Sequence, residues 1–322
     1  MSIIDQISVR VTAIKQVAPM IKEFTLEPLD GLLTPFSPGA HIVVEMGSSD
    51  SSSDKQSYRN AYSLMSDPMD SRQYRIAVRL QDDSRGGSVY MHQQVGVGTL
   101  LKISPPANLF APEWMAKKHV LFAGGVGITP FLSYLPELQQ RKAEFELHYM
   151  FRSRQTGAYS AELRETLGAG CSCYDADLGN RCDIAAVMSG QPLGTHFYIC
   201  GPESLIDAVQ TTADAMGIPA SAIHWEEFAG AKPGQPFVVE LSQSGIELAV
   251  AANSSLLEAL ESADIKIPNL CRAGVCGQCV CDVAEGEVEH RDSYLSDSEK
   301  QSGQVMMPCV SRAAGDRLVL DI

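Results

Sequence analysis

The sequence predicts a chain of mixed α/β and β class, with three domains in succession. Residues 1–113 alternate apolar and polar side chains with the period of antiparallel β-strands. Residues 114–228 alternate strand and helix patterns, which is typical of a parallel sheet. Residues 229–236 have the glycine- and proline-rich composition of a linker, and residues 237–322 form a smaller domain around a cysteine-rich loop. At 322 residues, the chain is long enough for each domain to bury its own core.

The composition is that of an ordinary globular protein with an acidic bias. Hydrophobic residues make up 45% of the chain and charged residues 20%, and the net charge is −14. Residues 237–322 carry 14 acidic and 6 basic side chains, so more than half of the net charge lies in the last domain. The acidic balance argues against nucleic acid as a partner. Two interpretations of the acidic domain remain open: a solvated surface, or a docking face for a partner with a basic patch.

The first residues and the cysteines bear on the location of the protein. The chain does not start with a basic segment followed by an apolar one, so we expect no signal peptide. No apolar run reaches the roughly 18 residues of a membrane span. Nine cysteines without a small disulfide framework fit a reducing compartment. We therefore expect a cytoplasmic protein without a membrane segment.

The N-terminal domain contains one turn that suits phosphate binding. Arg85-Gly86-Gly87-Ser88 follows the predicted strand 74–79 and precedes a predicted helix at 89–94. Two glycines, a hydroxyl, an arginine and free N–H groups at a helix start can together cradle a phosphate. Such turns also cap ordinary helices, so the motif alone is a weak signal.

In the second domain, a glycine-rich turn follows a buried strand. Residues 118–123 form the strand, and Gly124-Gly125-Val-Gly127-Ile-Thr129-Pro130 leads into a helix at 131–141. This order brings backbone amides to a pyrophosphate or a ring, although the turn lacks the dinucleotide G-x-G-x-x-G fingerprint. Three later predicted strands end at Arg152-Ser153-Arg154, at Cys200-Gly201-Pro202 and at Phe228. We expect a parallel sheet that binds its ligand at the carboxyl ends of these strands.

Four cysteines of the last domain have the spacing of a plant-type [2Fe–2S] site. Three form a C-x4-C-x2-C pattern and a fourth follows at a distance: Cys271, Cys276, Cys279 and Cys309. Gly274 and Gly277 supply the φ freedom that a tight loop around a cluster needs. A structural zinc site or free thiols are the alternatives, but zinc sites usually pair cysteines in two short clips. A helix at 256–263 precedes the loop, with Ser254 as its predicted N-cap.

Together, these motifs carry a resemblance to a known family. Arg-x-x-Tyr-Ser from Arg59, Arg-Gly-Gly-Ser, Gly-Gly-Val-Gly-Ile-Thr-Pro, Cys-Gly-Pro, an aromatic after Glu-Glu and a C-terminal ferredoxin pattern follow in this order. The chain resembles the phthalate dioxygenase reductase family, the reductase components of two-component Rieske oxygenases. Within it, stretches such as Asn-Ala-Tyr-Ser-Leu from Asn60 are most similar to carnitine monooxygenase reductase subunits. The resemblance implies an antiparallel β-barrel flavin domain, a parallel-sheet nucleotide domain and a C-terminal β-grasp plant-type ferredoxin domain.

The resemblance also implies cofactor roles for the residues at matching positions. FMN is expected at Arg59, Asn60, Ala61, Tyr62, Ser63, Ala77, Val78, Arg79, Arg85, Gly86, Gly87, Ser88 and Val89. The nicotinamide nucleotide is expected at Gly124, Gly125, Gly127, Arg152, Ser153, Gly201 and Pro202. Thr129 and Phe228 would lie near the flavin ring, and Cys200 would lie beside the nicotinamide. For Cys200, a buried small residue at a strand end is an equally good interpretation.

Two positions depart from the family pattern. Asn60 stands near the place of a family arginine, and Arg59 is one residue away, where a strand directs its side chain to the other face. The contact with the FMN phosphate is weakened there. Ser153 stands where the family has an acidic residue that favours the 2′-hydroxyl of NADH, and Arg154 follows it. NADH is the expected donor, with NADPH as the alternative.

The implied function is electron transfer. A nicotinamide releases two electrons as a hydride and a [2Fe–2S] cluster takes one, so a flavin must stand between them. We expect a reductase that passes electrons from NADH through FMN and the cluster to a Rieske oxygenase component, of the carnitine monooxygenase kind. The alternatives are a reductase for another acceptor such as a cytochrome P450 or a diiron hydroxylase, a non-catalytic electron carrier, and a zinc-stabilised adaptor.

Overall fold

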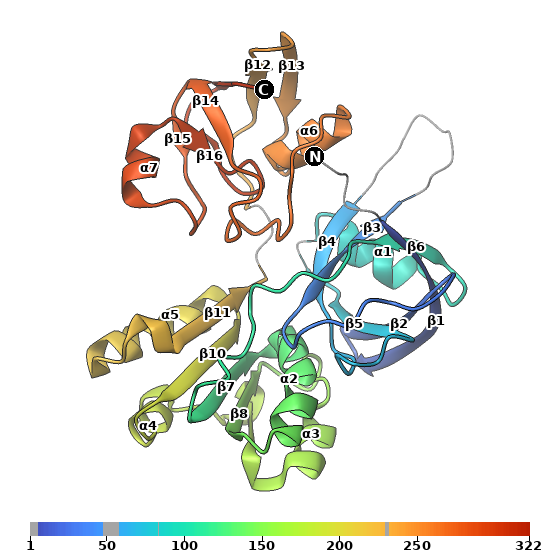
Figure 1. Cartoon of the computed structure of the whole chain (residues 1–322), viewed down its shortest axis with the longest axis vertical. Coiled ribbons are helices and arrows are strands. Elements are labelled where there is room, and N and C mark those ends of the chain that lie inside the picture. The colour runs from blue at the N-terminus through green and yellow to red at the C-terminus, as the bar shows by residue number, and fades with distance from the viewer. Residues whose placement is uncertain (1–5, 48–57, 83, 229–231) are drawn as a thin grey trace. The chain divides into compact units, whose positions relative to one another are not determined.

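The computed structural model describes residues 6–47, 58–82, 84–228 and 232–322 of the chain. The chain divides into two compact units, Met1–Phe228 and Ala229–Ile322 (Figure 1). Part of the predicted linker, residues 229–231, lies outside the described residues. The predicted boundary between residues 113 and 114, inside the first unit, stays a prediction.

The first unit begins with a six-stranded antiparallel sheet in the order β4-β3-β6-β1-β2-β5. Its strands are β1 (Ile7–Ala18), β2 (Ile21–Pro28), β3 (His41–Met46), β4 (Tyr58–Ser63), β5 (Tyr74–Arg79) and β6 (Leu100–Ile103). The sheet curls so that its outer strands β4 and β5 approach each other, which gives the expected barrel (Figure 1). Alternate residues such as Val9, Val11 and Phe24 fill its interior. The short helix α1 (Gly87–Gln93) follows β5.

A five-stranded parallel sheet completes the first unit, in the order β11-β10-β7-β8-β9. Its strands are β7 (Lys118–Gly124), β8 (Glu144–Phe151), β9 (Cys171–Asp175), β10 (Thr195–Gly201) and β11 (Ile223–Glu227). The connecting helices are η1 (Gly125–Ile128), α2 (Thr129–Gln140), α3 (Ser160–Leu167), α4 (Ile184–Ser189) and α5 (Glu203–Met216). α2 packs Phe131 and Tyr134 on one face of the sheet, and α5 packs Ile206 and Val209 on the other. Both faces are covered, as a parallel sheet requires.

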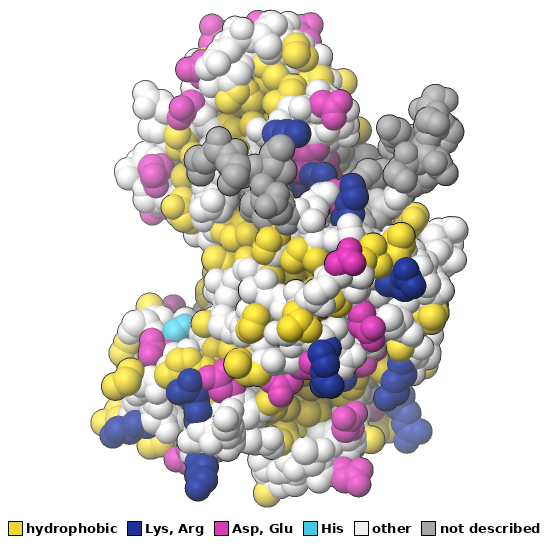
Figure 2. Space-filling model, turned by 45° about the vertical axis from the view of Figure 1, so that its right-hand side comes forward, with side chains coloured by type: hydrophobic (Ala, Val, Ile, Leu, Met, Phe, Trp, Pro, Cys, Tyr) yellow, Lys and Arg dark blue, Asp and Glu magenta, His cyan; other side chains and the backbone are white. Residues whose placement is uncertain are grey.

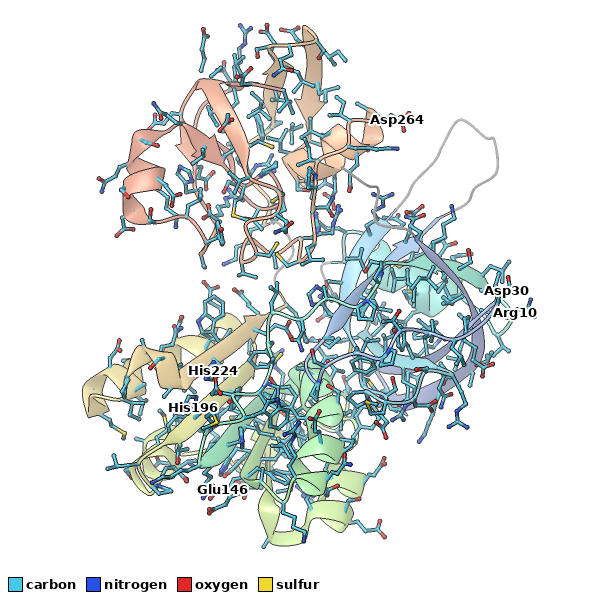
Figure 3. The ribbon with its side chains drawn as sticks, viewed as in Figure 1. Arg10, Asp30, Glu146, His196, His224 and Asp264 are labelled. Atoms are coloured by element: carbon cyan, nitrogen blue, oxygen red, sulfur yellow. The ribbon has the colours of Figure 1, made fainter. Side chains whose placement is uncertain are left out.

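Histidines gather near the amino ends of the central and edge strands. His196 on β10 and His224 on β11 lie side by side (Figure 3), with 2.9 Å between Nδ1 of the first and Nε2 of the second. His119 on β7 pairs in register with His196 and is 1% exposed. This cluster lies at the amino ends of the strands, opposite to their carboxyl ends, where the ligand is expected.

The barrel and the parallel sheet contact each other through polar bonds and a tight backbone approach. The Gly39 N–H donates to Ser133 Oγ on α2 (2.9 Å), and a Cβ at Gly39 would lie 2.0 Å from the Phe110 carbonyl oxygen. Tyr159 Oη donates to the Glu23 carboxylate on β2 (2.7 Å). These contacts hold the end of β5 beside η1, where a ligand of both domains can bind.

The second unit is a mixed five-stranded sheet in the order β13-β12-β18-β14-β16, with a separate two-stranded pair. Its strands are β12 (Phe237–Leu241), β13 (Ile246–Val250), β14 (Cys281–Glu285), β15 (Val288–Glu289), β16 (Val305–Met306), β17 (Arg312–Ala313) and β18 (Arg317–Leu320). Helix α6 (Leu256–Ser262) packs Leu256 and Leu260 on the sheet, and α7 (Asp297–Ser302) lies further along the chain. The parallel pairing of β12 with β18 under a helix gives the expected β-grasp.

The N-cap of α6 differs from the prediction. Ser255, not Ser254, accepts the N–H of Glu258 (3.1 Å), and the Glu258 carboxylate accepts the N–H of Ser255 (2.8 Å). This reciprocal capping box satisfies two N–H groups at once, so it is favoured over a cap one residue earlier.

The surface is mixed in character. Acidic and basic side chains are scattered among apolar ones over the face shown in Figure 2. Among the described residues, no helix combines the length and the apolar character that crossing a membrane would require.

Candidate functional site

A cleft of about 560 Å³ opens at the carboxyl ends of the parallel strands. It also reaches the end of β5 in the barrel, through Arg79 and Gln81. Among the predicted site residues, those lining it are Arg79, Gly124, Gly125, Gly127, Arg152, Gly201, Pro202 and Phe228. The cleft therefore joins the two expected cofactor regions of the first unit, at the edge where such sheets bind ligands.

Glycines form the floor of the cleft because two backbone segments meet there. A Cβ at Gly127 would lie 2.1 Å from the carbonyl oxygen of Cys200. A Cβ at Gly201 would lie 3.0 Å from the Gly124 Cα, and a Cβ at Gly124 would lie 2.7 Å from the ring of Pro202. The turn after β7 and the end of β10 thus touch backbone to backbone, which leaves the floor open for a flat or phosphorylated group.

Three predicted residues lie away from the cleft surface. Cys200 is fully buried. Its burial, and to a smaller extent the nearby Glu226 carboxylate, raise the pKa of its thiol well above the ordinary value. Thr129 is 2% exposed and donates its hydroxyl to the Val126 carbonyl (2.9 Å). Ser153 accepts the N–H of Gln155 (3.2 Å) and so caps a turn. The structure favours the buried-residue interpretation of Cys200, whereas Phe228 is 39% exposed and lines the cleft.

On the barrel side, the predicted phosphate turn lies against β4. A Cβ at Gly87 would lie 2.5 Å from Asn60 Nδ2, and a Cβ at Gly86 would lie 2.3 Å from the ring of Tyr58. Asn60 Nδ2 donates to Tyr62 Oη (3.2 Å). Burial raises the pKa of Tyr62 to about 12, so its phenol stays protonated and can donate to a ligand. The two predicted segments, 59–63 and 85–89, are therefore brought together.

Two buried polar atoms at this site have no hydrogen-bond partner among the described residues: Ser63 Oγ and Arg79 Nε. A buried group of this kind costs free energy unless a ligand or water satisfies it. Arg79 lines the cleft at the junction of barrel and sheet. These two atoms fit a flavin with many polar ring and ribityl atoms.

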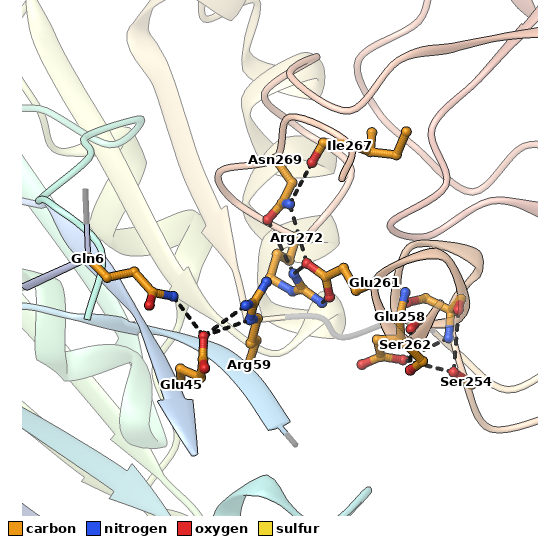
Figure 4. Close-up of polar contacts among 11 residues, drawn as sticks. Gln6, Glu45, Arg59, Ser254, Glu258, Glu261, Ser262, Ile267, Asn269 and Arg272 are labelled. Atoms are coloured by element: carbon orange, nitrogen blue, oxygen red, sulfur yellow. Dashed lines mark hydrogen bonds and ion pairs between the residues drawn. The ribbon is translucent and has the colours of Figure 1, made fainter. Parts of the chain in front are cut away.

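Arg59 is engaged elsewhere, as the strand geometry predicts. Its Nε and Nη2 donate to the Glu45 carboxylate on β3 (3.1 and 2.8 Å), which also accepts from Gln6 (Figure 4). The structure places the remaining predicted flavin residues in different surroundings. Ala77 and Val78 are buried in β5, and Ala61 and Arg85 are exposed. Ser88 donates to Ser84 Oγ (2.8 Å), and Val89 lies in α1.

In the second unit, the four predicted cluster cysteines come together as two pairs. Cys276 is the neighbour that most lowers the pKa of the Cys271 thiol, and Cys309 is the neighbour that most lowers the pKa of the Cys279 thiol. The thiol of Cys276 and the N–H groups of Ala273, Val275 and Cys276 lower the pKa of Cys271 to about 5. Two thiol pairs suit two irons with two thiolates each, as in a [2Fe–2S] cluster.

The cluster loop is fixed by glycines and by one buried ion pair. Gly274 (φ +75°) and Gly277 (φ +72°) adopt left-handed conformations, and a Cβ on Gly277 would lie 2.2 Å from the ring of Tyr294. The Arg272 guanidinium binds both oxygens of Glu261 on α6 (2.7 and 2.8 Å; Figure 4). The side chains of this pair are 9% and 17% exposed. The loop is therefore anchored to a helix that packs on the sheet.

Residues from β9 and from the loop after it also enter the cleft, and the sequence motifs did not predict them. Tyr174, Asn180 and Arg181 line the cleft there. The alternation of Cys171, Cys173 and Asp175, all buried, was the signal for this strand, and the Gly-Asn pair after it was the signal for a turn.

Two sequence profiles match this chain. The 2Fe-2S iron-sulfur cluster binding domain matches residues 239–314. The N-terminal domain of dimethylamine monooxygenase subunit DmmA-like proteins matches residues 100–223.

Relatives match over nearly the whole length. The heme-dependent oxidative N-demethylase beta subunit of Ectopseudomonas mendocina is 51% identical over 98% of this chain and 99% of its own. The carnitine monooxygenase reductase subunit of Acinetobacter baumannii is 44% identical over 97% and 96%. The solved structure of phthalate dioxygenase reductase, described as modular for electron transfer from pyridine nucleotides to [2Fe-2S], superposes with a TM-score of 0.84 at 32% identity, over 98% of each chain.

These findings confirm the expected fold class, the oxidoreductase function in electron supply to an oxygenase, and the flavin, nicotinamide and [2Fe–2S] cofactors of that architecture. They support an oxygenase component as the partner, and they do not identify the cofactor of that component. The individual site residues stay predictions. The chain belongs to the phthalate dioxygenase reductase family of iron–sulfur flavoprotein oxidoreductases.

Proposed function

We propose that this chain is the reductase component of a monooxygenase that removes a methyl or alkyl group from an amine. The observation that carries the proposal is the 51% identity, over 98% of the chain, with an oxidative N-demethylase beta subunit. The match of residues 100–223 to a dimethylamine monooxygenase subunit and the identity of 44% with a carnitine monooxygenase reductase point to the same substrate class.

In this role, FMN would be held between β4, β5 and the turn before α1. Ser63 Oγ and Arg79 Nε would each gain a hydrogen-bond partner. The protonated phenol of Tyr62 would donate a hydrogen bond to the flavin, and the N–H groups around Gly87 would face the phosphate. A bound flavin accepts two electrons from a nicotinamide and releases them one at a time. Asn60 supplies a neutral amide at this phosphate position, so Arg85 would carry the charge there.

The nicotinamide nucleotide would occupy the cleft in the parallel sheet. The glycine floor at Gly127 and Gly201 lets its ring and phosphates approach the backbone. Phe228, at the mouth, would shield the flavin ring from water until the nucleotide displaces it. The buried thiol of Cys200 lies below this floor, and the Cys200 carbonyl group, which touches Gly127, would hold the floor in position.

The cluster would be bound by Cys271 and Cys276 on one iron and by Cys279 and Cys309 on the other. The N–H groups that lower the pKa of Cys271 would stabilise negative charge on its sulfur. Arg272, paired with Glu261, would hold the loop in place during electron transfer.

Two kinds of acceptor are candidates in the oxygenase component. A heme is favoured by the N-demethylase relative, whose name specifies a heme-dependent reaction. A Rieske centre, expected from the sequence, is favoured by the structural match to phthalate dioxygenase reductase. The higher identity of the N-demethylase relative, 51% against 32%, places the heme first.

The test is reconstitution with purified oxygenase components. The chain would be mixed with the heme-containing component of an N-demethylase or with a Rieske-type carnitine oxygenase, and donor-dependent product formation would be measured. We expect amine dealkylation with at least one of them, faster with the heme component. Donor oxidation with artificial acceptors but without turnover of either component would contradict an amine oxygenase as the partner. The cytoplasmic location stays a prediction.

A further inference from the structure

We propose that Cys171 and Cys173 form a peroxide-sensitive dithiol, which closes to a disulfide and thereby weakens nucleotide binding in the cleft. The pair is separate from the cluster cysteines and from the glycine floor of the cleft. Formation of the disulfide is independent of what the cleft binds. Its effect on nucleotide binding rests on the proposed function of the cleft.

The two thiols lie in contact on one face of an edge strand. Cys171 and Cys173 are alternate residues of β9, so their side chains point to the same side of the sheet. The distance between the two Sγ atoms is 3.7 Å. β9 is the last strand in the order of the sheet, and each cysteine is 8% exposed. A small oxidant can therefore reach the pair from the open edge of the sheet.

Helix α3 places a positive charge beside the pair. The hydrogen bond with Cys171 lowers the pKa of the Cys173 thiol below its ordinary value, and the Arg164 guanidinium on α3 lowers it further, while burial opposes both effects. The same hydrogen bond and burial raise the pKa of Cys171. Because the thiolate is the form that attacks a peroxide, Cys173 should react first and Cys171 should supply the second sulfur.

The chemistry balances with hydrogen peroxide as the oxidant. The Cys173 thiolate attacks one peroxide oxygen, the O–O bond breaks and hydroxide leaves, so that Cys173 becomes a sulfenic acid. The Cys171 thiol then attacks the Cys173 sulfur, the S–S bond forms, the S–O bond breaks and water leaves. Overall, the two cysteines lose two electrons and two protons, and the peroxide is reduced to two molecules of water.

A pair of packing residues is the alternative interpretation. Both side chains belong to the core cluster that includes Leu163 of α3, and Cys173 pairs in register with Tyr149 of β8. Packing accounts for the burial of the two side chains. It does not account for a guanidinium beside the sulfurs, since an apolar contact gains nothing from a neighbouring cation.

Closure of the disulfide must shorten β9. An extended strand rises about 3.2–3.4 Å per residue, which places the two Cα atoms roughly 6.5 Å apart. Disulfides most often span about 5.5–6 Å between Cα atoms, so the backbone must contract by about 0.5–1 Å. An edge strand with a single partner, β8, can contract locally without disturbing a second neighbour.

The strand is tied to the cleft through the loop that follows it. The Cys173 carbonyl accepts a hydrogen bond from Asn180 Nδ2 (3.2 Å), and the Asp175 carbonyl accepts one from the Asn180 N–H (3.1 Å). Asn180 and its neighbour Arg181 line the cleft. Contraction of β9 moves the Cys173 carbonyl and so displaces Asn180. Loss of one hydrogen bond of this kind corresponds to about a two- to tenfold change in affinity.

The test treats the full protein with hydrogen peroxide and measures two quantities. The first is the mass of the peptide that contains both cysteines, after digestion without a reductant. The second is the NADH concentration at which flavin reduction reaches half of its maximal rate. We expect the peptide to lose two hydrogen atoms, the NADH concentration to rise about two- to tenfold, and dithiothreitol to reverse both changes.

Substitutions separate the two steps of the oxidation. Cys171→Ser keeps the attacking thiol but removes the second sulfur, so a sulfenic acid should accumulate at Cys173 and be trapped by dimedone. Cys173→Ser should give neither the sulfenic acid nor the disulfide. Both variants should reduce the flavin like the wild type before treatment, and Cys171→Ala replaces Cys171→Ser if the serine variant does not fold. Peroxide damage to the iron–sulfur cluster should be equal in all of them and should persist after dithiothreitol.

The matched control is Cys182→Ser. Cys182 is a more exposed thiol in the same domain, and burial raises its pKa, so its loss should leave the disulfide and the change in NADH dependence intact. Oxidation of Cys182 while the Cys171 and Cys173 thiols stay reduced would overturn the proposal. A disulfide that forms without a change in NADH dependence would overturn its link to the cleft.

These outcomes are separable from the proposed function. An untreated protein whose flavin is not reduced by NADH or NADPH would contradict the proposed function, and the mass of the peptide would still decide whether the disulfide forms. Normal flavin reduction together with a peptide of unchanged mass would leave the proposed function intact and refute only the dithiol.

Discussion

Gly127→Ala tests whether the backbone contact between η1 and β10 builds the floor of the cleft. The added Cβ would lie 2.1 Å from the Cys200 carbonyl oxygen, 2.5 Å from its carbon and 2.9 Å from the Gly201 nitrogen. All three are backbone atoms of a central strand, so no side chain can move aside. To restore the smallest distance that real Cβ atoms show, 3.0 Å, the turn must move by about 1 Å.

This displacement has an expected cost in stability and in activity. Overpacking of a tight site costs about 1–3 kcal/mol, and a rigid backbone neighbour places Gly127→Ala at the upper end. For a cooperative unit of this size, about 3 kcal/mol corresponds to a loss of roughly 6–12 °C in melting temperature. A misplacement of about 1 Å can also slow a reaction about 100-fold.

Gly125→Ala is the matched control in the same turn. Gly125 has φ +56°, and a Cβ added there would meet no atom within 4 Å, so alanine at this position causes backbone strain without a clash. We expect a loss of about 1 kcal/mol and a smaller decrease in rate. The assay is thermal unfolding together with stopped-flow reduction of the flavin by NADH or NADPH. Equal effects of the two substitutions would refute the role of the backbone contact.

Three further predictions concern other parts of the chain. Gly87→Ala places a Cβ 2.5 Å from Asn60 Nδ2 and should lower FMN content after gel filtration; full retention of FMN would contradict the cradle. Arg272→Gln removes the cation that binds the largely buried Glu261 carboxylate and should destabilise the second unit by about 3 kcal/mol, measured by denaturant titration of the cluster absorbance. Its control, Arg317→Gln, removes an exposed pair and should change the stability far less. Burial and two neighbouring histidines lower the pKa of His119 to about 4. As the pH falls, the unfolded chain therefore takes up this proton at a higher pH than the folded chain does. Stability is complete above about pH 6.5 and decreases as the pH falls toward 4, and His119→Phe should flatten the dependence of the melting temperature on pH.

Local sequence pattern was sufficient to predict much of the fold. The strand before the glycine turn and the helix that follows Thr129-Pro130 both lie where hydrophobic periodicity predicts them. The cysteine spacing is likewise a local signal, because three of the four thiols share one loop.

Tertiary contacts decided the features that the sequence pattern missed or left open. β9 is a short edge strand that pairs with β8, and this pairing brings Arg181, in the loop after β9, to the cleft. The burial of Cys200 follows from its place in a core cluster with Phe131 and Tyr134, residues of α2 that lie more than 60 positions away in the chain. The engagement of Arg59 by Glu45 depends on the register between β3 and β4.

An anaerobic titration of the purified protein with NADH, followed by absorbance, tests the central claim most directly. We expect stoichiometric bleaching of the flavin band and of the iron–sulfur band, because one chain carries electrons from the nucleotide cleft to the cysteine loop. A flavin that bleaches while the cluster stays oxidised would contradict the electron route. A protein without either band would contradict the assignment of its cofactors.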